Sequence, residues 1–206
     1  TTLLKALTRI LRPLSGDIRY RDTDLAKVDL KLFAGEVAFV PQETYAAFSF
    51  GVLDVVLMGR YPHLGRFEME SKDDYKIAER ALETVGCLAI ADEALDEISS
   101  GERQRVIIAK ALAQEPSLLL LDEATAHLDL KHRLEIMDII SGLNEDKNMT
   151  VLMVTQDINM ASSYCRRILM IKEGAIYKDG PPEDVLTTDN IRAVYGARVL
   201  VDIHPL

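Results

Sequence analysis

The chain has 206 residues, of which 48% are hydrophobic, so it is long enough to bury one substantial core. Its formal net charge of −9 argues against a nucleic-acid-binding protein, which would need a basic surface. No apolar run approaches the ~18 residues of a membrane-spanning helix, and no signal peptide is visible. The two cysteines, Cys87 and Cys165, lack metal-ligand spacing, which favours reduced thiols in a cytosolic protein. Any role at a membrane is therefore expected to come through a partner protein.

The first residues predict an amphipathic helix with a threonine cap. Apolar residues recur at helical spacing from Leu3 to Leu11, and Pro13 is expected to end the helix.

Two short strands are predicted next. Residues 17–20 follow a turn at Ser15-Gly16, and residues 37–40 form the β-branched and aromatic run that is typical of a buried strand. Pro41-Gln42 ends this second strand. A lone glutamine after a strand usually has no special role, so the importance of Gln42 depends on its place relative to later motifs.

The region from about residue 43 to residue 97 predicts helices rather than further sheet. Residues 52–58 and 75–85 have helical periodicity. The segment that links them, residues 59–67, contains Tyr61 together with Arg60 and Arg66. An exposed aromatic residue flanked by arginines matches the composition of interface hot spots. The alternative is a solvated loop with a half-buried tyrosine.

A turn of small residues opens the next helix. Ser99-Ser100-Gly101 precedes an amphipathic run that continues to Ala113 and is broken by Glu115-Pro116. Free backbone N–H groups at such a helix start suit phosphate oxygens. With Glu102, the same residues could instead form an ordinary N-cap with its capping box.

Four leucines followed by two carboxylates form the most informative stretch. Residues 118–121 predict a strand that is buried on both faces of a parallel sheet. Asp122 and Glu123 follow directly, at the carboxyl end of the strand, where open α/β sheets bind their ligands. Carboxylates there suit the Mg²⁺ that accompanies a nucleoside triphosphate. Taken alone, the pair could equally be the acidic first turn of a helix.

The remaining sequence continues the alternation of helices and strands. It predicts a helix over residues 134–143, a buried strand over 150–154 that leads to Thr155-Gln156-Asp157, strands over 167–171 and 175–178, a turn at Gly180-Pro181-Pro182, and two short helices.

Taken together, these motifs resemble those of the ATPase subunits of ATP-binding cassette (ABC) transporters. Residues 98–102 are similar to the signature motif of the family, residues 118–123 to its Walker B motif, and residues 124–129 to its D-loop. In the same register, Gln42 matches the Q-loop glutamine. Within the family, residues 59–65 are similar to a segment found in importers of iron-siderophore, haem and cobalamin.

The resemblance implies an α/β fold with a P-loop NTPase-type, mostly parallel sheet and an inserted helical subdomain. One ABC ATPase domain would cover residues 1–206, with a RecA-like catalytic core over 1–42 and 114–206 and the helical subdomain with the signature motif over 43–113. Thr1 matches the Ser/Thr that follows the lysine of the phosphate-binding loop. Most of that loop would then precede residue 1, so we expect an N-terminally truncated cassette with weak ATP affinity.

The resemblance also implies ATP and Mg²⁺ as cofactors and assigns roles to individual residues. Glu123 would orient and deprotonate the attacking water, while Gln42 and Gln156 would act near the γ-phosphate. Asp122, Thr1 and Gln42 would serve as metal ligands, and Asp129 would bridge a dimer. The full set of predicted nucleotide contacts is Thr1, Thr2, Gln42, Ser99, Ser100, Gly101, Glu102, Asp129 and Gln156.

Two residues depart from the pattern of the family. Ser100 replaces the first glycine of the usual Ser-Gly-Gly, and its Cβ tolerates a positive φ less well. Gln156 replaces the switch histidine, and a glutamine donates a neutral hydrogen bond but carries no positive charge. These departures keep open the alternative of a nucleotide-binding module with low turnover.

The function implied by the resemblance is that of an ATP-hydrolysing subunit of an ABC importer for iron-siderophore, haem or cobalamin. Its partners would be a second copy bound head to tail, transmembrane permease subunits and, indirectly, a substrate-binding protein, with no nucleic acid. It would lie peripherally on the cytoplasmic face of the cell membrane. A soluble ABC protein of translation or repair is the other alternative, and the absence of a long coiled-coil insertion argues against the repair branch.

Overall fold

The computed structural model describes residues 1–42, 50–126, 128–146 and 149–202. These residues divide into two compact units, Thr1–Val154 and Thr155–Leu206. None of the helices in the described ranges is both long and apolar enough to cross a membrane.

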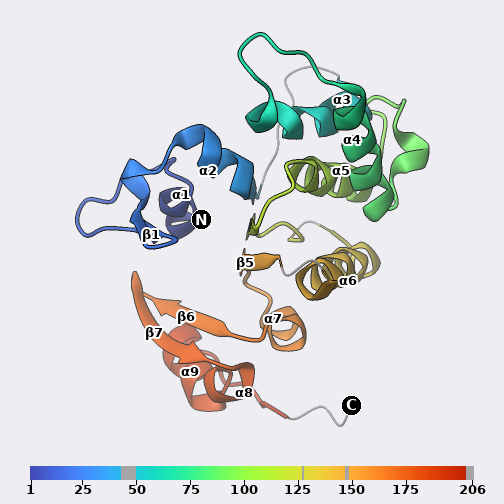
Figure 1. The fold of residues 1–206 in the computed structure, drawn as a ribbon. Coiled ribbons are helices and arrows are strands. Elements are labelled where there is room, and N and C mark those ends of the chain that lie inside the picture. The colour runs from blue at the N-terminus through green and yellow to red at the C-terminus, as the bar shows by residue number, and fades with distance from the viewer. Residues whose placement is uncertain (43–49, 127, 147–148, 203–206) are drawn as a thin grey trace. The chain divides into compact units, whose positions relative to one another are not determined.

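A parallel sheet lies at the centre of the first unit (Figure 1). Its strands are arranged in the order β3 (Val37–Val40), β4 (Leu118–Asp122) and β5 (Thr150–Val154). Because β4 has a neighbour on each side, Leu119, Leu120 and Leu121 are fully buried. The strands predicted at these positions are confirmed, and their parallel pairing puts all three carboxyl ends at one edge of the sheet.

The elements that precede the sheet pack against its core. They are α1 (Thr2–Leu7), the hairpin of β1 (Arg19–Tyr20) and β2 (Thr23–Asp24), the 3₁₀ helix η1 (Leu25–Lys27) and α2 (Leu30–Glu36). Leu4, Leu25 and Phe33 from these elements form a buried cluster with Val37 and Leu120 of the sheet. This cluster fixes the start of the chain near β4.

Helix α1 is shorter than the sequence predicts. It ends at Leu7 and does not continue to Leu11. The chain turns away because Arg9 has a positive φ of 63°, and its guanidinium Nη1 donates a hydrogen bond of 2.7 Å to the carbonyl oxygen of Val28. The strand predicted over residues 17–20 is likewise reduced to Arg19–Tyr20.

A group of helices lies between β3 and β4 in the sequence. It comprises α3 (Val52–Leu57), the 3₁₀ helix η2 (Met58–His63), α4 (Lys72–Thr84), the 3₁₀ helix η3 (Leu88–Ile90) and α5 (Ser100–Ala113). Helices α3, α4 and α5 pack against one another around buried Val52, Leu82 and Val106 (Figure 1). The predicted helices are confirmed, and α4 starts earlier than predicted because Ser71 and Asp74 form a capping box at its N-terminus.

The linking segment predicted as a loop over residues 59–67 is a loop only in its second part. Residues 58–63 form η2 rather than a loop. Arg60 is buried, with only 6% of its surface exposed, whereas Tyr61 is 58% exposed. The burial of Arg60 reflects its ion pairs with Asp74 and Glu115, which the spacing of the sequence does not reveal.

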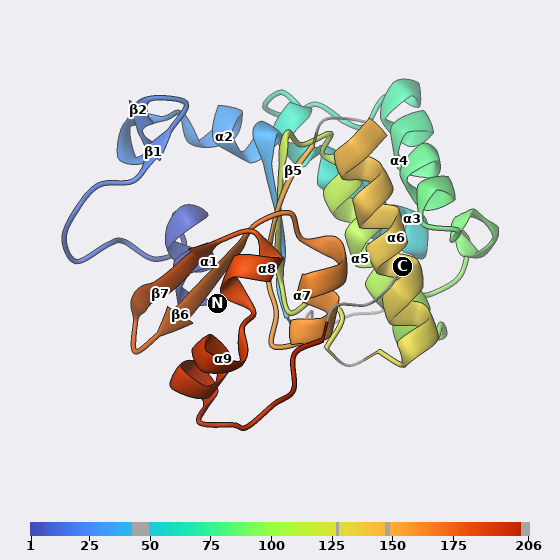
Figure 2. The ribbon, with the colours of Figure 1, turned by 90° about the horizontal axis from the view of Figure 1, so that it is seen from below.

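After β4, helix α6 (Leu130–Asp146) leads to β5 and completes the first unit. The second unit contains α7 (Ile158–Tyr164), the antiparallel hairpin of β6 (Ile168–Lys172) and β7 (Ala175–Gly180), α8 (Pro182–Val185) and α9 (Thr188–Tyr195). Helix α8 packs against the hairpin (Figure 2), where Met170, Val185 and Ile191 share a buried cluster. The two strands and two short helices predicted for this region are confirmed.

Candidate functional site

The carboxyl end of β4 holds the first predicted site residue. Asp122 is the last residue of this strand, and only 1% of its surface is exposed. Its Oδ1 accepts a hydrogen bond of 3.0 Å from the hydroxyl of Thr1, although 121 positions separate the two residues. Thr1 occupies the N-cap position of α1, but its side chain makes no capping hydrogen bond. Its hydroxyl binds Asp122 instead.

These two side chains suit a small, hard cation. A carboxylate and a hydroxyl are oxygen donors, the kind that Mg²⁺ prefers, and Mg²⁺ usually takes only one or two ligands from the protein while phosphates and water supply the rest. Thr1 and Asp122 already lie within hydrogen-bond distance of each other. The pair that the sequence predicted therefore fits Mg²⁺ bound together with a nucleotide.

Glu123 follows Asp122 in a turn, and backbone hydrogen bonds fix both its N–H and its carbonyl group. Its N–H donates to the carbonyl oxygen of Val154 at 3.0 Å, and its own carbonyl oxygen accepts from the N–H of Ala126 at 3.0 Å. The turn requires a φ of 48° at Glu123, an unfavourable value for a residue with a Cβ. Such strain often occurs at functional sites, where the surrounding bonds maintain it.

Gln42 reaches this turn from the neighbouring strand. Its side-chain Nε2 donates to Oε2 of Glu123 at 3.4 Å, which is a long hydrogen bond. Gln42 comes two positions after the end of β3 and Glu123 one position after the end of β4, so the parallel pairing of the strands brings them together. Thr2 is exposed at the first turn of α1, and its nucleotide contact stays a prediction.

The residues that resemble a signature motif begin helix α5. Ser99 is the N-cap, and its hydroxyl donates to Oε2 of Glu102 at 2.6 Å while its backbone N–H donates to the same oxygen at 3.0 Å. These hydrogen bonds lower the pKa of Glu102. The capping box foreseen as an alternative is thus present. Ser100 is the first helical residue and does not have a positive φ, so the strain expected there does not arise.

Gly101 connects this helix start to the start of α6. A Cβ at Gly101 would come within 3.1 Å of the imidazole ring of His132, so glycine allows the two helices to approach closely. Asp129 accepts a hydrogen bond of 3.0 Å from the backbone N–H of His132, and its Oδ2 lies 2.8 Å from the His132 Nδ1. These two hydrogen bonds lower the pKa of Asp129, the backbone one most.

His132 is a neighbour of the predicted dimer contacts that the sequence analysis missed. Its signal was the spacing Asp129-x-x-His132, because a residue three positions after an N-cap can bond back to it. In the predicted D-loop, His127 lies outside the described residues.

Gln156 belongs to the second unit. It is exposed and follows the end of β5 by two positions. The next residue, Asp157, is the N-cap of α7 and accepts a hydrogen bond of 3.0 Å from the N–H of Met160. The predicted contact of Gln156 with a γ-phosphate stays a prediction.

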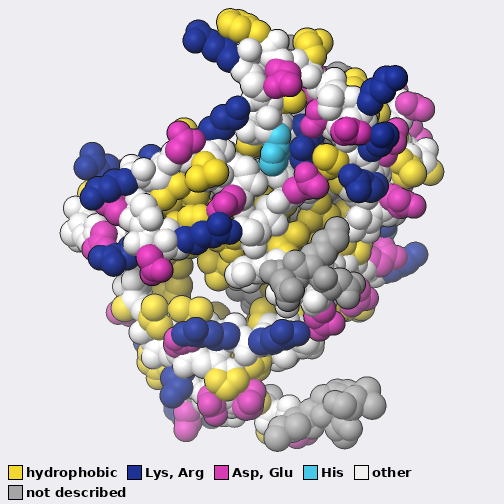
Figure 3. Space-filling model, viewed as in Figure 1, with side chains coloured by type: hydrophobic (Ala, Val, Ile, Leu, Met, Phe, Trp, Pro, Cys, Tyr) yellow, Lys and Arg dark blue, Asp and Glu magenta, His cyan; other side chains and the backbone are white. Residues whose placement is uncertain are grey.

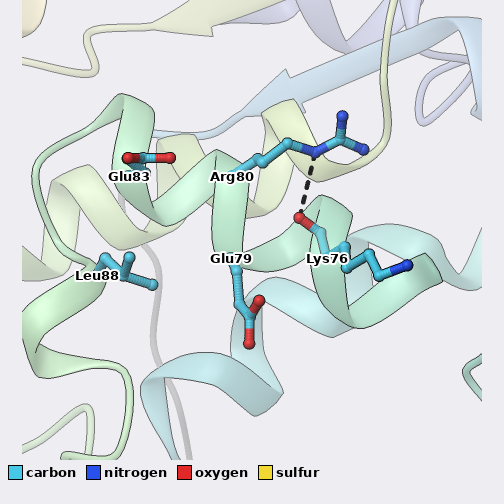
Figure 4. A pocket seen from close by; sticks show the side chains of 5 residues that line it. All are labelled: Lys76, Glu79, Arg80, Glu83 and Leu88. Carbon is cyan, nitrogen blue, oxygen red and sulfur yellow. Dashed lines mark hydrogen bonds between the residues drawn. The ribbon is translucent and has the colours of Figure 1, made fainter. Parts of the chain in front are cut away.

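A separate groove lies along α4 and η3 (Figure 4). It is lined by Lys76, Glu79, Arg80, Glu83 and Leu88, and Nε of Arg80 donates to the Lys76 carbonyl oxygen at 3.3 Å. None of the residues predicted to contact a nucleotide lines this groove. The candidate site is therefore the sheet edge formed by Thr1, Gln42, Asp122 and Glu123.

A family model described as ABC transporter matches residues 1–126 of the 206. The chain belongs to the ABC transporter family. This ABC chain is 38% identical, over its whole length and 75% of the relative's length, to the "probable siderophore transport system ATP-binding protein YusV" of Bacillus subtilis. It is 35% identical over 205 residues to the cobalamin import ATP-binding protein BtuD of Halobacterium salinarum, of which it spans only 51%.

A solved structure extends the comparison to the fold. The ATP-binding cassette MJ0796, a dimer bound to ADP and Pi in a post-hydrolysis state, superposes with a TM-score of 0.76 at 28% identity over 88% of this chain and 79% of that one. The family, the P-loop NTPase-type fold and the ATP hydrolase activity predicted from the sequence are thereby confirmed.

Proposed function

We propose that this ABC chain hydrolyses ATP to power an importer for a siderophore, haem or cobalamin. The observation that carries the ATPase part is the pair of contacts, Thr1 to Asp122 and Gln42 to Glu123, at one edge of the parallel sheet. The cargo part is supported by the siderophore and cobalamin relatives and by the segment at residues 59–65.

The geometry supports separate roles for the residues at the sheet edge. Asp122 and Thr1 would hold Mg²⁺, which supplies positive charge against the phosphates when it is bound. Glu123 would accept a proton from the attacking water, and Gln42 would orient the carboxylate through its amide. Because phosphoryl transfer asks mainly for positioning and charge stabilisation, the fixed backbone of the Glu123 turn is suited to this role.

The second cluster would complete the site of another copy of the chain. In a head-to-tail dimer, Ser99, Ser100, Gly101 and Glu102 would contact the nucleotide held by the partner, and Asp129 would bridge the two copies. The close approach of Gly101 to His132, which lies within hydrogen-bond distance of Asp129, places these elements side by side. The dimeric state of the MJ0796 cassette supports the arrangement.

Transport by the reconstituted complex tests the proposal. The full-length protein, assembled with its permease in liposomes, should import one of three labelled cargoes, a ferric siderophore, haem or cobalamin, only when ATP and Mg²⁺ are supplied. The Glu123→Gln variant of the same complex serves as the control without hydrolysis. Hydrolysis without import of any of the three would disprove the importer assignment but not the ATPase.

The permease subunit is proposed to contact the surface near Tyr61. Tyr61 is 58% exposed, Phe67 is 92% exposed and Met69 is also largely exposed, so this part of the helical region offers apolar surface. Over the helices at the top of Figure 3, apolar side chains lie among intermixed acidic and basic ones. Arg66 lies 5.4 Å from the Phe67 ring centroid, a cation–π distance. The chain would then lie peripherally at the cytoplasmic face of the membrane, with a substrate-binding protein as an indirect partner and no nucleic acid.

Replacing Tyr61 with alanine should uncouple transport while leaving the ATPase activity of the isolated subunit within about twofold of wild type. Interface aromatic residues that act as hot spots carry about 2 kcal/mol or more of binding energy. Tyr61 is exposed on η2 and is not one of the residues that form the candidate site, so hydrolysis should change little. Uptake and ATPase assays on the same preparation give the two readouts. Tyr75→Ala on α4, another partly exposed tyrosine, is the matched control, and normal uptake by the Tyr61 variant would favour the non-interface alternative.

Replacing Gln156 with histidine should raise kcat with little change in nucleotide affinity. A histidine supplies a stronger donor and, when protonated, a charge-assisted one that strengthens most in the transition state. Steady-state ATPase kinetics of the two full-length proteins, measured side by side, decide the matter. A kcat for the histidine variant that is equal or lower would instead support the alternative of a site rebuilt around glutamine.

A further inference from the structure

The segment Gly59-Arg60-Tyr61-Pro62-His63 packs against the C-terminal end of α5. At Gly59 the backbone approaches so closely that a Cβ would overlap the carbonyl oxygen of Lys110. The C-terminal carbonyl groups of a helix lack partners within the helix, so they need donors from elsewhere. Helix η2 supplies two of these donors.

Arg60 is the first donor, and its side chain is buried. Its Nη1 donates to the carbonyl oxygen of Ala113 at 2.7 Å and to Oε2 of Glu115 at 2.9 Å, and its Nε donates to Oδ1 of Asp74 at 2.9 Å. The pKa of Asp74 falls to about 2 because of hydrogen bonds from Ser71 and, next, from Arg60. A buried charge is tolerated only when it is paired in this way, and a cation is favourable at the C-terminal end of a helix.

Gln114, the residue directly after α5, forms hydrogen bonds through both its backbone and its side chain. The carbonyl oxygen of Gln114 lies 2.8 Å from Nε2 of His63, on η2. The side-chain amide of Gln114 donates to the carbonyl oxygens of Ala34 and Val37, at the end of α2 and the start of β3. The end of α5 is therefore fixed both to η2 and to the sheet.

The other end of α5 carries the residues that resemble the signature motif. The helix has 14 residues, starting at Ser100 and preceded by the N-cap Ser99. Because an α-helix is stiff over this length, the placement of its last turn also determines where its first turn lies.

We propose that Arg60 is a positioning residue that holds α5 so that Ser99 and Gly101 face the nucleotide of a second copy. The inference rests on the proposed function, in which the signature residues act across a dimer. Arg60, which is buried, would thus contribute to dimer assembly. Its exposed neighbour Tyr61 would not.

The test measures dimer assembly and nucleotide binding separately in the full-length protein. In the Glu123→Gln background, where hydrolysis is slow, Arg60→Met should weaken ATP-driven dimerisation about tenfold, measured by analytical ultracentrifugation. Binding of a fluorescent ATP analogue to the dilute monomer should stay within about twofold, because the hydrogen-bond partners of Arg60 are Asp74, Ala113 and Glu115 and not the residues of the sheet edge. Arg60→Lys, which keeps the charge and a donor, should restore part of the dimerisation. Arg80→Met removes an exposed arginine of α4, the helix that carries Asp74, and should leave dimerisation unchanged.

Three results separate the possibilities. Undiminished dimerisation of Arg60→Met would overturn the inference, as would an equal loss of monomer nucleotide binding in a variant that circular dichroism shows to be folded. If Arg60→Met does not fold, His63→Ala removes only the exposed donor to Gln114 and should weaken dimerisation about twofold to threefold; no weakening would overturn the inference. Failure of the Glu123→Gln protein with native Arg60 to dimerise with ATP would refute the proposed function instead.

Discussion

Replacing Glu123 with glutamine should lower ATP turnover by about 10²–10⁴-fold while leaving ATP binding intact. Glutamine keeps the size of the side chain and can still accept the hydrogen bond that Gln42 donates at 3.4 Å. It cannot take a proton from the attacking water at neutral pH, so the loss falls on the chemical step. The ATP-bound dimer should consequently persist longer, visible by size-exclusion chromatography after addition of Mg-ATP.

A matched control separates proton acceptance from backbone effects. Glu173 also has a positive φ, 50°, in the turn between β6 and β7, so Glu173→Gln makes the same chemical change in a similar backbone conformation. It should leave turnover unchanged. Turnover of the Glu123 variant at the wild-type rate would remove Glu123 from the mechanism, and a parallel loss of ATP binding would indicate that the substitution disturbs the turn.

The parts of the site that follow from strand order could be predicted from sequence. Asp122 and Glu123 come directly after four leucines, and Gln42 follows the other buried run, so a parallel sheet necessarily brings their ends to one edge. The capping box of Ser99 and Glu102 was also foreseeable, because its partners are three residues apart. Local spacing and strand polarity are properties that the sequence carries directly.

Arg60 illustrates what the sequence could not reveal. Its partners Asp74, Ala113 and Glu115 lie 14, 53 and 55 positions away, so its burial depends on how the helices pack and not on its neighbours. Local composition alone grouped Arg60 with Tyr61 and Arg66 as candidate interface residues. The end of α1 was missed for the same reason, since Arg9 turns the chain by bonding Val28, 19 positions later.

Replacing Asp122 with asparagine should reduce Mg²⁺-dependent hydrolysis by at least about 100-fold, because even outer partners of metal ligands cost 10–100-fold when they are lost. Asp122 is almost fully buried at the end of β4 and accepts a hydrogen bond from the Thr1 hydroxyl. The amide of asparagine is neutral, and its nitrogen is a donor, which opposes a cation. A Mg²⁺ titration of ATPase activity should show a higher half-maximal metal concentration as well as a lower maximum.

The readout that isolates the metal is ATP binding measured with and without Mg²⁺. If Asp122 acts through the cation, binding of ATP in the presence of EDTA should be the same for wild type and Asp122→Asn, whereas only the wild type should gain affinity when Mg²⁺ is added. Asp73→Asn makes the same change on α4, where Asp73 pairs with Lys76 at the surface, and should preserve the gain. An equal gain for Asp122→Asn would exclude this carboxylate as a metal ligand, and a loss of binding in EDTA would assign it instead to holding Thr1 and the start of α1 against the sheet.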